Sequence, residues 1–240
     1  MARKRILLIM LCVLTIATGV SNGFAMPFFT DASKQAVFLS PLEKWDPTWR
    51  LEAYISPLQR AGYQVDVLLN ENVSISFLKT GLAKYDLIIL RTDSFTLEGF
   101  SYYCSGETAT FKSRATFAAE ISSREVGVGA CVGFSMLFLQ HYYPAGSLRP
   151  ALVYVLGGPS AELSSAFLSA GASAFIGYYE AYSIGWGRMD AYSQKLFEYL
   201  SQGYSVVDAT MQMLAYLKIG HGSTADWPAS YWAGDGSFTI

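Results

Sequence analysis

The sequence has few of the residues that most often carry enzyme chemistry. Its 240 residues include two histidines, His141 and His221, and three cysteines, Cys12, Cys104 and Cys131. Acidic residues show no spacing typical of a zinc or calcium site. The pair Gly157-Gly158 lacks the lysine and the serine or threonine of a phosphate-binding loop. We therefore expect neither a metal nor a cofactor.

Charge is also scarce, and basic residues do not dominate. Charged residues make up 15% of the chain, with 17 basic and 19 acidic side chains. Three of the basic residues are Arg3, Lys4 and Arg5, so the rest of the chain carries a formal charge of −5. This balance argues against nucleic acid and against anionic membrane surfaces as partners.

Long apolar runs are absent except at the N-terminus. There, Arg3-Lys4-Arg5 precedes an uncharged apolar stretch from Ile6 to Val20, and small residues follow as far as Ala25. This order is typical of a secretory signal peptide, so we predict one at residues 1–25 and a mature chain from Met26. Fifteen apolar residues fall short of the roughly 20 that span a bilayer. An uncleaved anchor is the alternative, and in either case we expect an exported protein, secreted or held at the outer face of the membrane.

Two cysteines remain in the mature chain. An oxidising compartment favours a disulfide between Cys104 and Cys131. Two separate buried thiols are the alternative that the sequence leaves open.

Two apolar runs, Tyr85–Arg91 and Ala151–Leu156, are typical of buried strands in a parallel sheet. Similar runs near residues 36–39, 63–69 and 173–178 alternate with helical patterns. These helices are expected at 47–61, 74–81, 133–142, 160–170 (capped by Ser160), 189–201 and 206–219. The alternation predicts an α/β three-layer sandwich with a mostly parallel central sheet.

The remaining segments are less regular. Residues 94–132 favour surface loops and short hairpins, with a possible helix around 111–121. Asp235-Gly236 indicates a turn before a last short strand. Since no linker divides the chain, we predict a single domain over residues 26–240.

Several short motifs occur in one order along the C-terminal half. They are the helix end and turn of residues 166–172, the triplet 176–178, the segment 200–209 and the closing segment 234–240. This series resembles the caspase-like cysteine peptidases, a fold that includes clostripain, gingipain and CHAT-type proteins. The resemblance implies a histidine after the strand that ends at Arg91 and a cysteine after the strand that ends at Leu156. Asp93 and Gly158 occupy those two positions here.

These replacements determine the functional prediction. A carboxylate with an ordinary pKa near 3.9 is a poor general acid at neutral pH, and glycine has no nucleophile. We therefore expect a catalytically inactive domain that acts as a structural module or binds a peptide or protein segment. The alternative is a cysteine peptidase with a relocated pair: Cys104 or Cys131 with His141 or His221.

The expected binding residues lie past the carboxyl ends of the strands, where parallel sheets place their ligands. Asp93, Ser94, Gly157 and Gly158 follow the two apolar runs. The resemblance adds the aromatic cluster after the fifth strand, Tyr178, Tyr179, Tyr182 and Trp186. Aromatic rings with a polar tip suit a surface that is partly apolar and partly wet. The alternative is that they only cover the edge of the sheet.

Overall fold

The computed structural model describes residues 33–45, 51–179, 186–221 and 230–240. Residues 33–240 form one compact unit. The predicted signal peptide or anchor, and the predicted start at Met26, lie outside the described residues. Within the described residues, no helix is long and apolar enough to cross a membrane.

A six-stranded main sheet forms the centre of the fold. Its strands are β1 (Lys34–Ser40), β2 (Tyr63–Leu69), β3 (Leu87–Arg91), β8 (Leu152–Leu156), β9 (Ala174–Tyr178) and β10 (Ser230–Gly234). They lie in the order β10-β9-β8-β3-β1-β2. Strands β1, β2, β3, β8 and β9 are parallel to one another, and β10 pairs antiparallel with β9. The predicted mostly parallel sheet is confirmed.

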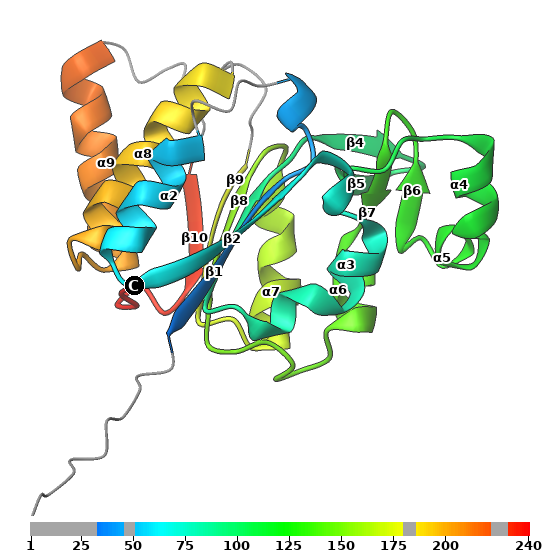
Figure 1. The fold of residues 1–240 in the computed structure, drawn as a ribbon, viewed down its shortest axis with the longest axis horizontal. Coiled ribbons are helices and arrows are strands. Elements are labelled where there is room, and N and C mark those ends of the chain that lie inside the picture. Colours follow the sequence, from blue (N-terminus) through cyan, green and yellow to red (C-terminus); the bar gives the residue numbers. More distant parts are fainter. Residues whose placement is uncertain (1–32, 46–50, 180–185, 222–229) are drawn as a thin grey trace, which may run out of the picture. The chain divides into compact units, whose positions relative to one another are not determined.

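Helices cover both faces of the main sheet (Figure 1). One face carries α2 (Leu51–Arg60), α8 (Trp186–Ser201) and α9 (Val206–His221), and the other carries α3 (Ile75–Thr80), α6 (Met136–Tyr142) and α7 (Ser164–Ala170). Successive residues of β3 belong to opposite cores: Ile88 packs in the cluster of Phe138, and Ile89 packs in that of Phe197. Every residue of the strand is therefore buried, which explains its unbroken apolar run.

Within this unit, residues 94–135 carry a second, smaller sheet, and we call this segment the arm. Its antiparallel sheet has the order β4-β5-β7-β6, from β4 (Ser94–Leu97), β5 (Phe100–Cys104), β6 (Val126–Val128) and β7 (Val132–Phe134). Two short helices, α4 (Phe111–Thr116) and α5 (Ala118–Ser122), complete it (Figure 1). The sequence predicted hairpins and a helix here but not a four-stranded sheet. The helix expected at 133–142 begins only at Met136, because Val132–Phe134 pairs as β7.

Short 3₁₀ turns connect these elements. They are η1 (Glu43–Trp45), η3 (Asn70–Asn72), η4 (Gly81–Lys84) and η5 (Ser160–Leu163). Ser160 was expected to cap the following helix, but this prediction is wrong. Its hydroxyl donates to the carbonyl of Val155 (2.9 Å) and accepts from the amide of Tyr178 (3.1 Å), and α7 begins at Ser164. Ser160 thus bridges β8 and β9 where the two strands end.

The C-terminal turn also differs from the sequence-based expectation. Asp235-Gly236 follows β10 instead of preceding a last strand. The predicted helix at 47–61 is described only from Leu51, since residues 46–50 lie outside the described part. Gly171 ends α7 with φ +117°, in the left-handed conformation that the sequence predicted for a helix end.

Candidate functional site

The carboxyl edge of the main sheet has a topological switch between β1 and β3. The chain leaves β1 toward β2 on one side and places β3 and the later parallel strands on the other. Connections that leave in opposite directions open a crevice at such a point, and α/β proteins bind ligands there. The fold alone therefore marks the ends of β1 and β3 as a candidate site.

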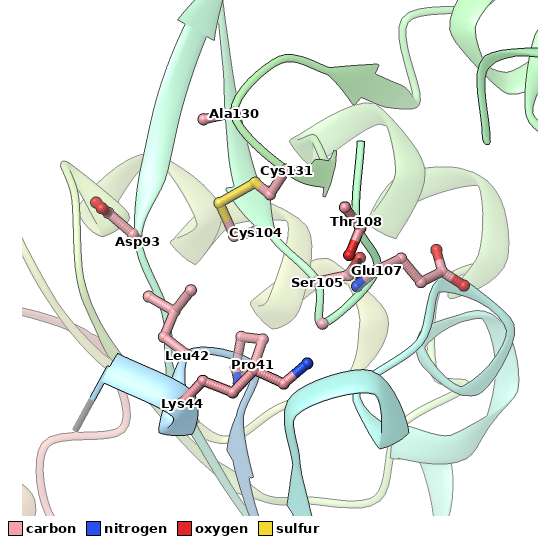
Figure 2. Close-up of a pocket in the computed structure, with 11 residues that line it drawn as sticks. Pro41, Leu42, Lys44, Asp93, Cys104, Ser105, Glu107, Thr108, Ala130 and Cys131 are labelled. Atoms are coloured by element: carbon pink, nitrogen blue, oxygen red, sulfur yellow. Dashed lines mark hydrogen bonds between the residues drawn. A yellow bond between two sulfur atoms is a disulfide. The ribbon is translucent and has the colours of Figure 1, made fainter. Parts of the chain in front are cut away.

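A cavity of about 370 Å³ lies at this switch point. We call it the switch-point cavity. Pro41, Leu42 and Lys44 line it from the end of β1, and Asp93 lines it from the end of β3. Figure 2 shows these residues around the opening, together with Cys104 and Cys131. The arm supplies the remaining lining residues: Ser105, Gly106, Glu107, Thr108 and Ala130.

A disulfide between Cys104 and Cys131 forms part of the cavity wall. The two Cα atoms are 5.7 Å apart, within the usual range for a bridged pair. Cys104 ends β5, and Cys131 lies in the turn between β6 and β7. The sequence left open whether these residues pair, and the structure joins them. In this oxidised state neither sulfur is a thiolate.

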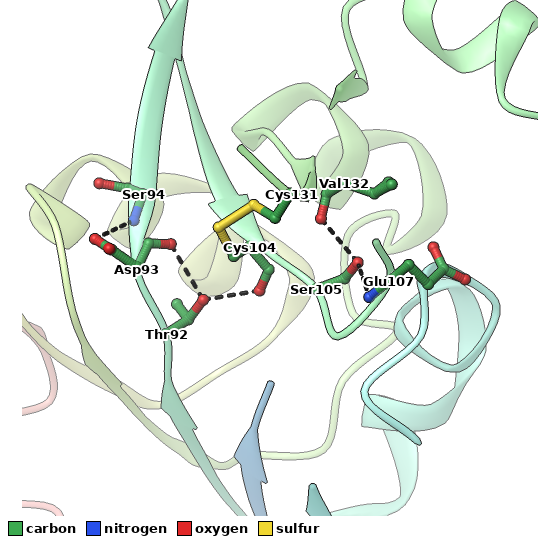
Figure 3. The surroundings of a disulfide bond; sticks show 8 residues. All are labelled: Thr92, Asp93, Ser94, Cys104, Ser105, Glu107, Cys131 and Val132. Carbon is green, nitrogen blue, oxygen red and sulfur yellow. Dashed lines mark hydrogen bonds between the residues drawn. A yellow bond between two sulfur atoms is a disulfide. The ribbon is translucent and has the colours of Figure 1, made fainter. Parts of the chain in front are cut away.

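Backbone and hydroxyl contacts attach the arm to the end of β3 (Figure 3). The Cys104 amide donates to the Asp93 carbonyl (2.9 Å), and the Thr92 hydroxyl donates to the Cys104 carbonyl (2.7 Å). The Thr92 amide in turn donates to the carbonyl of Leu156, at the end of β8. The cavity wall is therefore fixed to two adjacent strands of the main sheet.

The two positions singled out from the sequence follow the ends of β3 and β8, and Ser94, next to Asp93, is the residue that lies against Gly158. Gly158 has φ +54°, a conformation that side chains rarely adopt. A Cβ built on Gly158 would lie 2.6 Å from Ser94 Cβ and closer still to Ser94 Oγ. Ser94 therefore occupies the space that a side chain at position 158 would need. Its neighbour Asp93 is exposed and accepts the Ser94 amide on Oδ1 at 2.8 Å.

Tyr103 packs next to the Ser94–Gly158 contact. Its ring is fully buried, and its hydroxyl bonds the Pro159 carbonyl (3.0 Å) and Glu162 Oε1 (2.8 Å). The turn after β8 is thus held against the arm as well as against Ser94.

A second hollow of about 320 Å³ lies beyond this turn, and we call it the tyrosine hollow. It is lined by Pro159, Ala161, Glu162, Tyr179 and Tyr231. Tyr179 is 55% exposed and meets Tyr231 edge-on, with ring centroids 5.0 Å apart. Asp93, next to Ser94, lines the switch-point cavity, and Pro159, next to Gly158, lines the tyrosine hollow.

Of the aromatic residues expected at the site, one lines a hollow and another is buried in the core. Tyr179 lines the tyrosine hollow, whereas Tyr178 is buried in the core, where its hydroxyl bonds that of Tyr154 (2.9 Å). Alternation along β9 explains this, because neighbouring residues of a strand point to opposite faces. Tyr182 lies outside the described residues, and Trp186 begins α8 with a side chain that is not described.

Of the histidines in the relocated-pair alternative, His141 lines neither hollow. His141 Nδ1 lies 2.8 Å from Glu125 Oε1, and its ring stacks on Tyr142. His221 is the last residue of α9, and its side chain is not described. Since both cysteines are bonded to each other, the structure brings no cysteine–histidine pair together among the described side chains.

Sequence reasoning missed a buried ion pair beneath the site. Arg91, the last residue of β3, donates from Nε to Asp190 Oδ1 (2.9 Å) and from Nη2 to Oδ2 (3.1 Å). Tyr54 also donates to Oδ1 (2.7 Å), and burial together with the charge of Asp190 raises the pKa of Tyr54 well above its usual value. An arginine at the end of a buried strand signals a buried partner. That partner lies 99 residues further on, so the sequence could not identify it.

Glu107, in the cavity wall, has a carboxyl group with a shifted pKa. Burial raises the pKa of its carboxyl, while a hydrogen bond from the Ile75 backbone acts in the opposite direction. Its Oε2 atom is buried and has no hydrogen-bond partner within the described part of the chain. No group of side chains suited to hold a metal ion occurs among the described residues.

Comparison with known proteins identifies the fold but not a family. No protein-family model and no curated protein sequence matches the chain. Among solved structures, the Drosophila initiator caspase Dronc matches with a TM-score of 0.50 and 8% sequence identity. The match covers 85% of this chain and 79% of the Dronc chain. The chain therefore has a caspase-like fold, and at this identity the likeness shows the fold alone.

Proposed function

We propose that the chain is an exported, catalytically inactive caspase-like domain that binds a peptide or protein segment at the carboxyl edge of its main sheet. The observation that carries the proposal is the contact between Gly158 and Ser94. Neither glycine nor the aspartate at position 93 supplies a nucleophile with its base. The side-chain space next to Gly158 is filled, so inactivity is a property of the packing as well as of the residue types.

The two hollows support binding of an extended segment. The switch-point cavity is lined by Asp93, next to Ser94, and the tyrosine hollow by Pro159, next to Gly158. A chain crossing the Ser94–Gly158 contact would place one side chain in each hollow. The exposed ring of Tyr179 suits such a role, because tyrosine offers a large apolar face and a polar tip at low entropic cost.

A labelling experiment tests inactivity. The mature protein is incubated with peptidyl inhibitors that react with catalytic thiols and with a diverse peptide library, and mass spectrometry follows both. We expect no adduct at the carboxyl edge and no cleaved peptide. Cleavage that disappears in Cys104→Ala or Cys131→Ala would replace the proposal by the relocated-pair peptidase.

A reconstruction experiment tests the assignment of the two positions. Asp93→His and Gly158→Cys are combined with Ser94→Gly, which clears the space beside position 158. We expect the introduced thiol to alkylate roughly tenfold faster at pH 6 than the thiol of Gly158→Cys alone, since an adjacent imidazole stabilises the thiolate. The matched control keeps Ser94 and should show no such gain.

Binding is tested with the same protein. Peptides selected from a displayed library should lose affinity on Tyr179→Ala and keep it on Tyr204→Ala, an exposed tyrosine that lines neither hollow. Equal loss in both variants, or selected peptides that protect another surface, would contradict the proposed site.

Export is tested at the N-terminus. N-terminal sequencing of the protein from its native host should begin near Met26. An intact Met1 chain in the membrane fraction would favour the uncleaved anchor.

A further inference from the structure

We propose that the Cys104–Cys131 bond is a thiol–disulfide exchange site that low-molecular-weight thiols reach through the switch-point cavity, with Cys131 Sγ as the atom attacked. Both cysteines line this cavity. This inference rests on the disulfide and the cavity, and it does not depend on peptide binding or on the loss of catalysis.

The two cysteines differ in access. Cys104 is 6% exposed and lies in β5, whereas Cys131 is partly exposed and lies in the turn between β6 and β7. Exchange requires an approach to one sulfur, so the more accessible residue receives the attack. The cavity volume of about 370 Å³ falls in the range of pockets that admit small molecules.

The two cysteines also differ in how firmly their backbones are held. The Cys104 amide and carbonyl both bond the Thr92-Asp93 segment at the end of β3. The Cys131 carbonyl accepts only a bond from Gly129 within the same turn among the described contacts. When the bridge opens, Cys104 keeps its place in β5, and the 129–131 turn loses its covalent tie to that strand.

The chemistry balances with thiols as reductant. A thiolate attacks Cys131 Sγ, its sulfur bonds to Cys131, and Cys104 leaves as a thiolate that takes a proton from water. A second thiolate then attacks the added sulfur, which leaves the protein as part of a small disulfide and releases Cys131. Two thiols are oxidised, and the protein disulfide is reduced by two electrons.

The charges around the cavity favour thiols that carry a positive group. Asp93 and Glu107 line the cavity together with Lys44, which pairs with Glu71 outside the lining at 3.3 Å, so the acids outnumber the base. Asp93 is the exposed acid of the two, with Oδ1 engaged by the Ser94 amide. A single charge at about 4 Å changes a rate by roughly fivefold in water, so an aminothiol should react faster than an anionic thiol of similar size.

The test uses the oxidised mature protein without denaturant. Cysteamine and 3-mercaptopropionate are compared at equal thiolate concentration, the reaction is quenched with acid, and peptide mapping locates the adduct. We expect the mixed disulfide on Cys131 and at least about fivefold faster exchange with cysteamine. Asp93→Asn keeps an oxygen for the Ser94 amide but removes the charge, and it should lower the preference for cysteamine.

Three results would overturn the inference. They are an adduct on Cys104, exchange only at denaturant concentrations that unfold the chain, or an unchanged preference in Asp93→Asn. The double variant Cys104→Ser/Cys131→Ser leaves the mature chain without a cysteine and should form no adduct. A protein that binds no peptide but exchanges as described would leave this inference intact and contradict only the proposed function.

Discussion

The main sheet and the arm hold their parts together in different ways. The main sheet buries β3, β8 and β9 along their whole length, and both helical layers pack onto it. The arm is thinner: α4 and α5 contain no buried residue, and Phe111 at its outer end is 88% exposed. The candidate site lies where the two meet. The main sheet forms its floor, and the arm, whose strands β6 and β7 are buried but whose helices are not, forms its wall.

Each part also has its own long-range tie. The main sheet is joined to α8 by the buried Arg91–Asp190 pair, and the arm is closed by the Cys104–Cys131 bond. This difference between the two ties indicates that substitutions in the main sheet should lower the stability of the whole chain. Substitutions in the arm should alter the candidate site before they affect the stability of the main sheet.

The largest expected effect comes from the buried pair. Asp190→Ala removes the carboxylate that Arg91 and Tyr54 both bond, and it leaves a buried guanidinium without that anion. We expect the free energy of unfolding to fall by about 3–5 kcal/mol, as measured by urea unfolding. Arg149→Ala, which breaks a half-exposed pair with Asp86 at 3.7 Å, is the control and should cost less than about 1 kcal/mol. Equal losses of unfolding free energy in the two variants would show that the buried pair is no more important for stability than the exposed one.

Removal of the disulfide should have the next largest effect. Cys104→Ala/Cys131→Ala opens a loop whose ends are 27 residues apart, for which the expected loss is about 3 kcal/mol. Hydrogen exchange should rise in β5–β7 before it rises in β3 and β8. Exchange that rises in parallel in both sheets would show that the arm is not a separate unit of stability.

Two glycine-to-alanine substitutions separate the cost of the steric contact at the site from the cost of backbone strain. Gly158→Ala combines a left-handed backbone with a contact against Ser94, and we expect a loss of about 1–3 kcal/mol. Gly99→Ala, at φ +80° in the β4–β5 turn, meets nothing within 4 Å and reports the backbone strain alone. Ser94→Gly should recover the difference between them in the Gly158→Ala background. Identical urea midpoints for the two alanine variants would remove the steric argument.

The sequence predicted the main sheet well because its signal is continuous. Runs such as Leu87–Arg91 are apolar at every position, and Gly171 ends a helix in the conformation that its residue type allows. The arm gave a weaker signal, since β6 and β7 are three residues long and glycine interrupts each. The Tyr102 ring lies where a Cβ on Gly127 would stand, and the Phe95 ring lies where a Cβ on Gly133 would stand, so the small residues there are part of the packing.

Parts of the site could not be predicted, because they depend on three-dimensional contacts. The positions of Asp93 and Gly158 could be predicted, because each follows the end of an apolar strand. That Ser94 occupies the space of a side chain at position 158 could not, because it depends on the φ angle of Gly158. The switch-point cavity needs the strand order, which places the end of β1 beside β3. Asp190 could not be matched to Arg91 across 99 residues.

The smallest effect comes from two helix caps that allow a matched comparison. The Ser74 hydroxyl accepts the Phe77 amide at the start of α3, and the Thr110 hydroxyl accepts the Ser113 amide at the start of α4. Loss of such a cap costs about 1 kcal/mol of helix stability. Because α3 buries Ile75 and Leu78, Ser74→Ala should lower the free energy of unfolding of the whole chain by about that amount. Since α4 buries no residue, Thr110→Ala should fray α4 and speed exchange of its amides, while the urea midpoint stays unchanged. A midpoint shift as large as that of Ser74→Ala would mean that α4 folds cooperatively with the main sheet, and the arm would then be as firmly packed as the floor of the site.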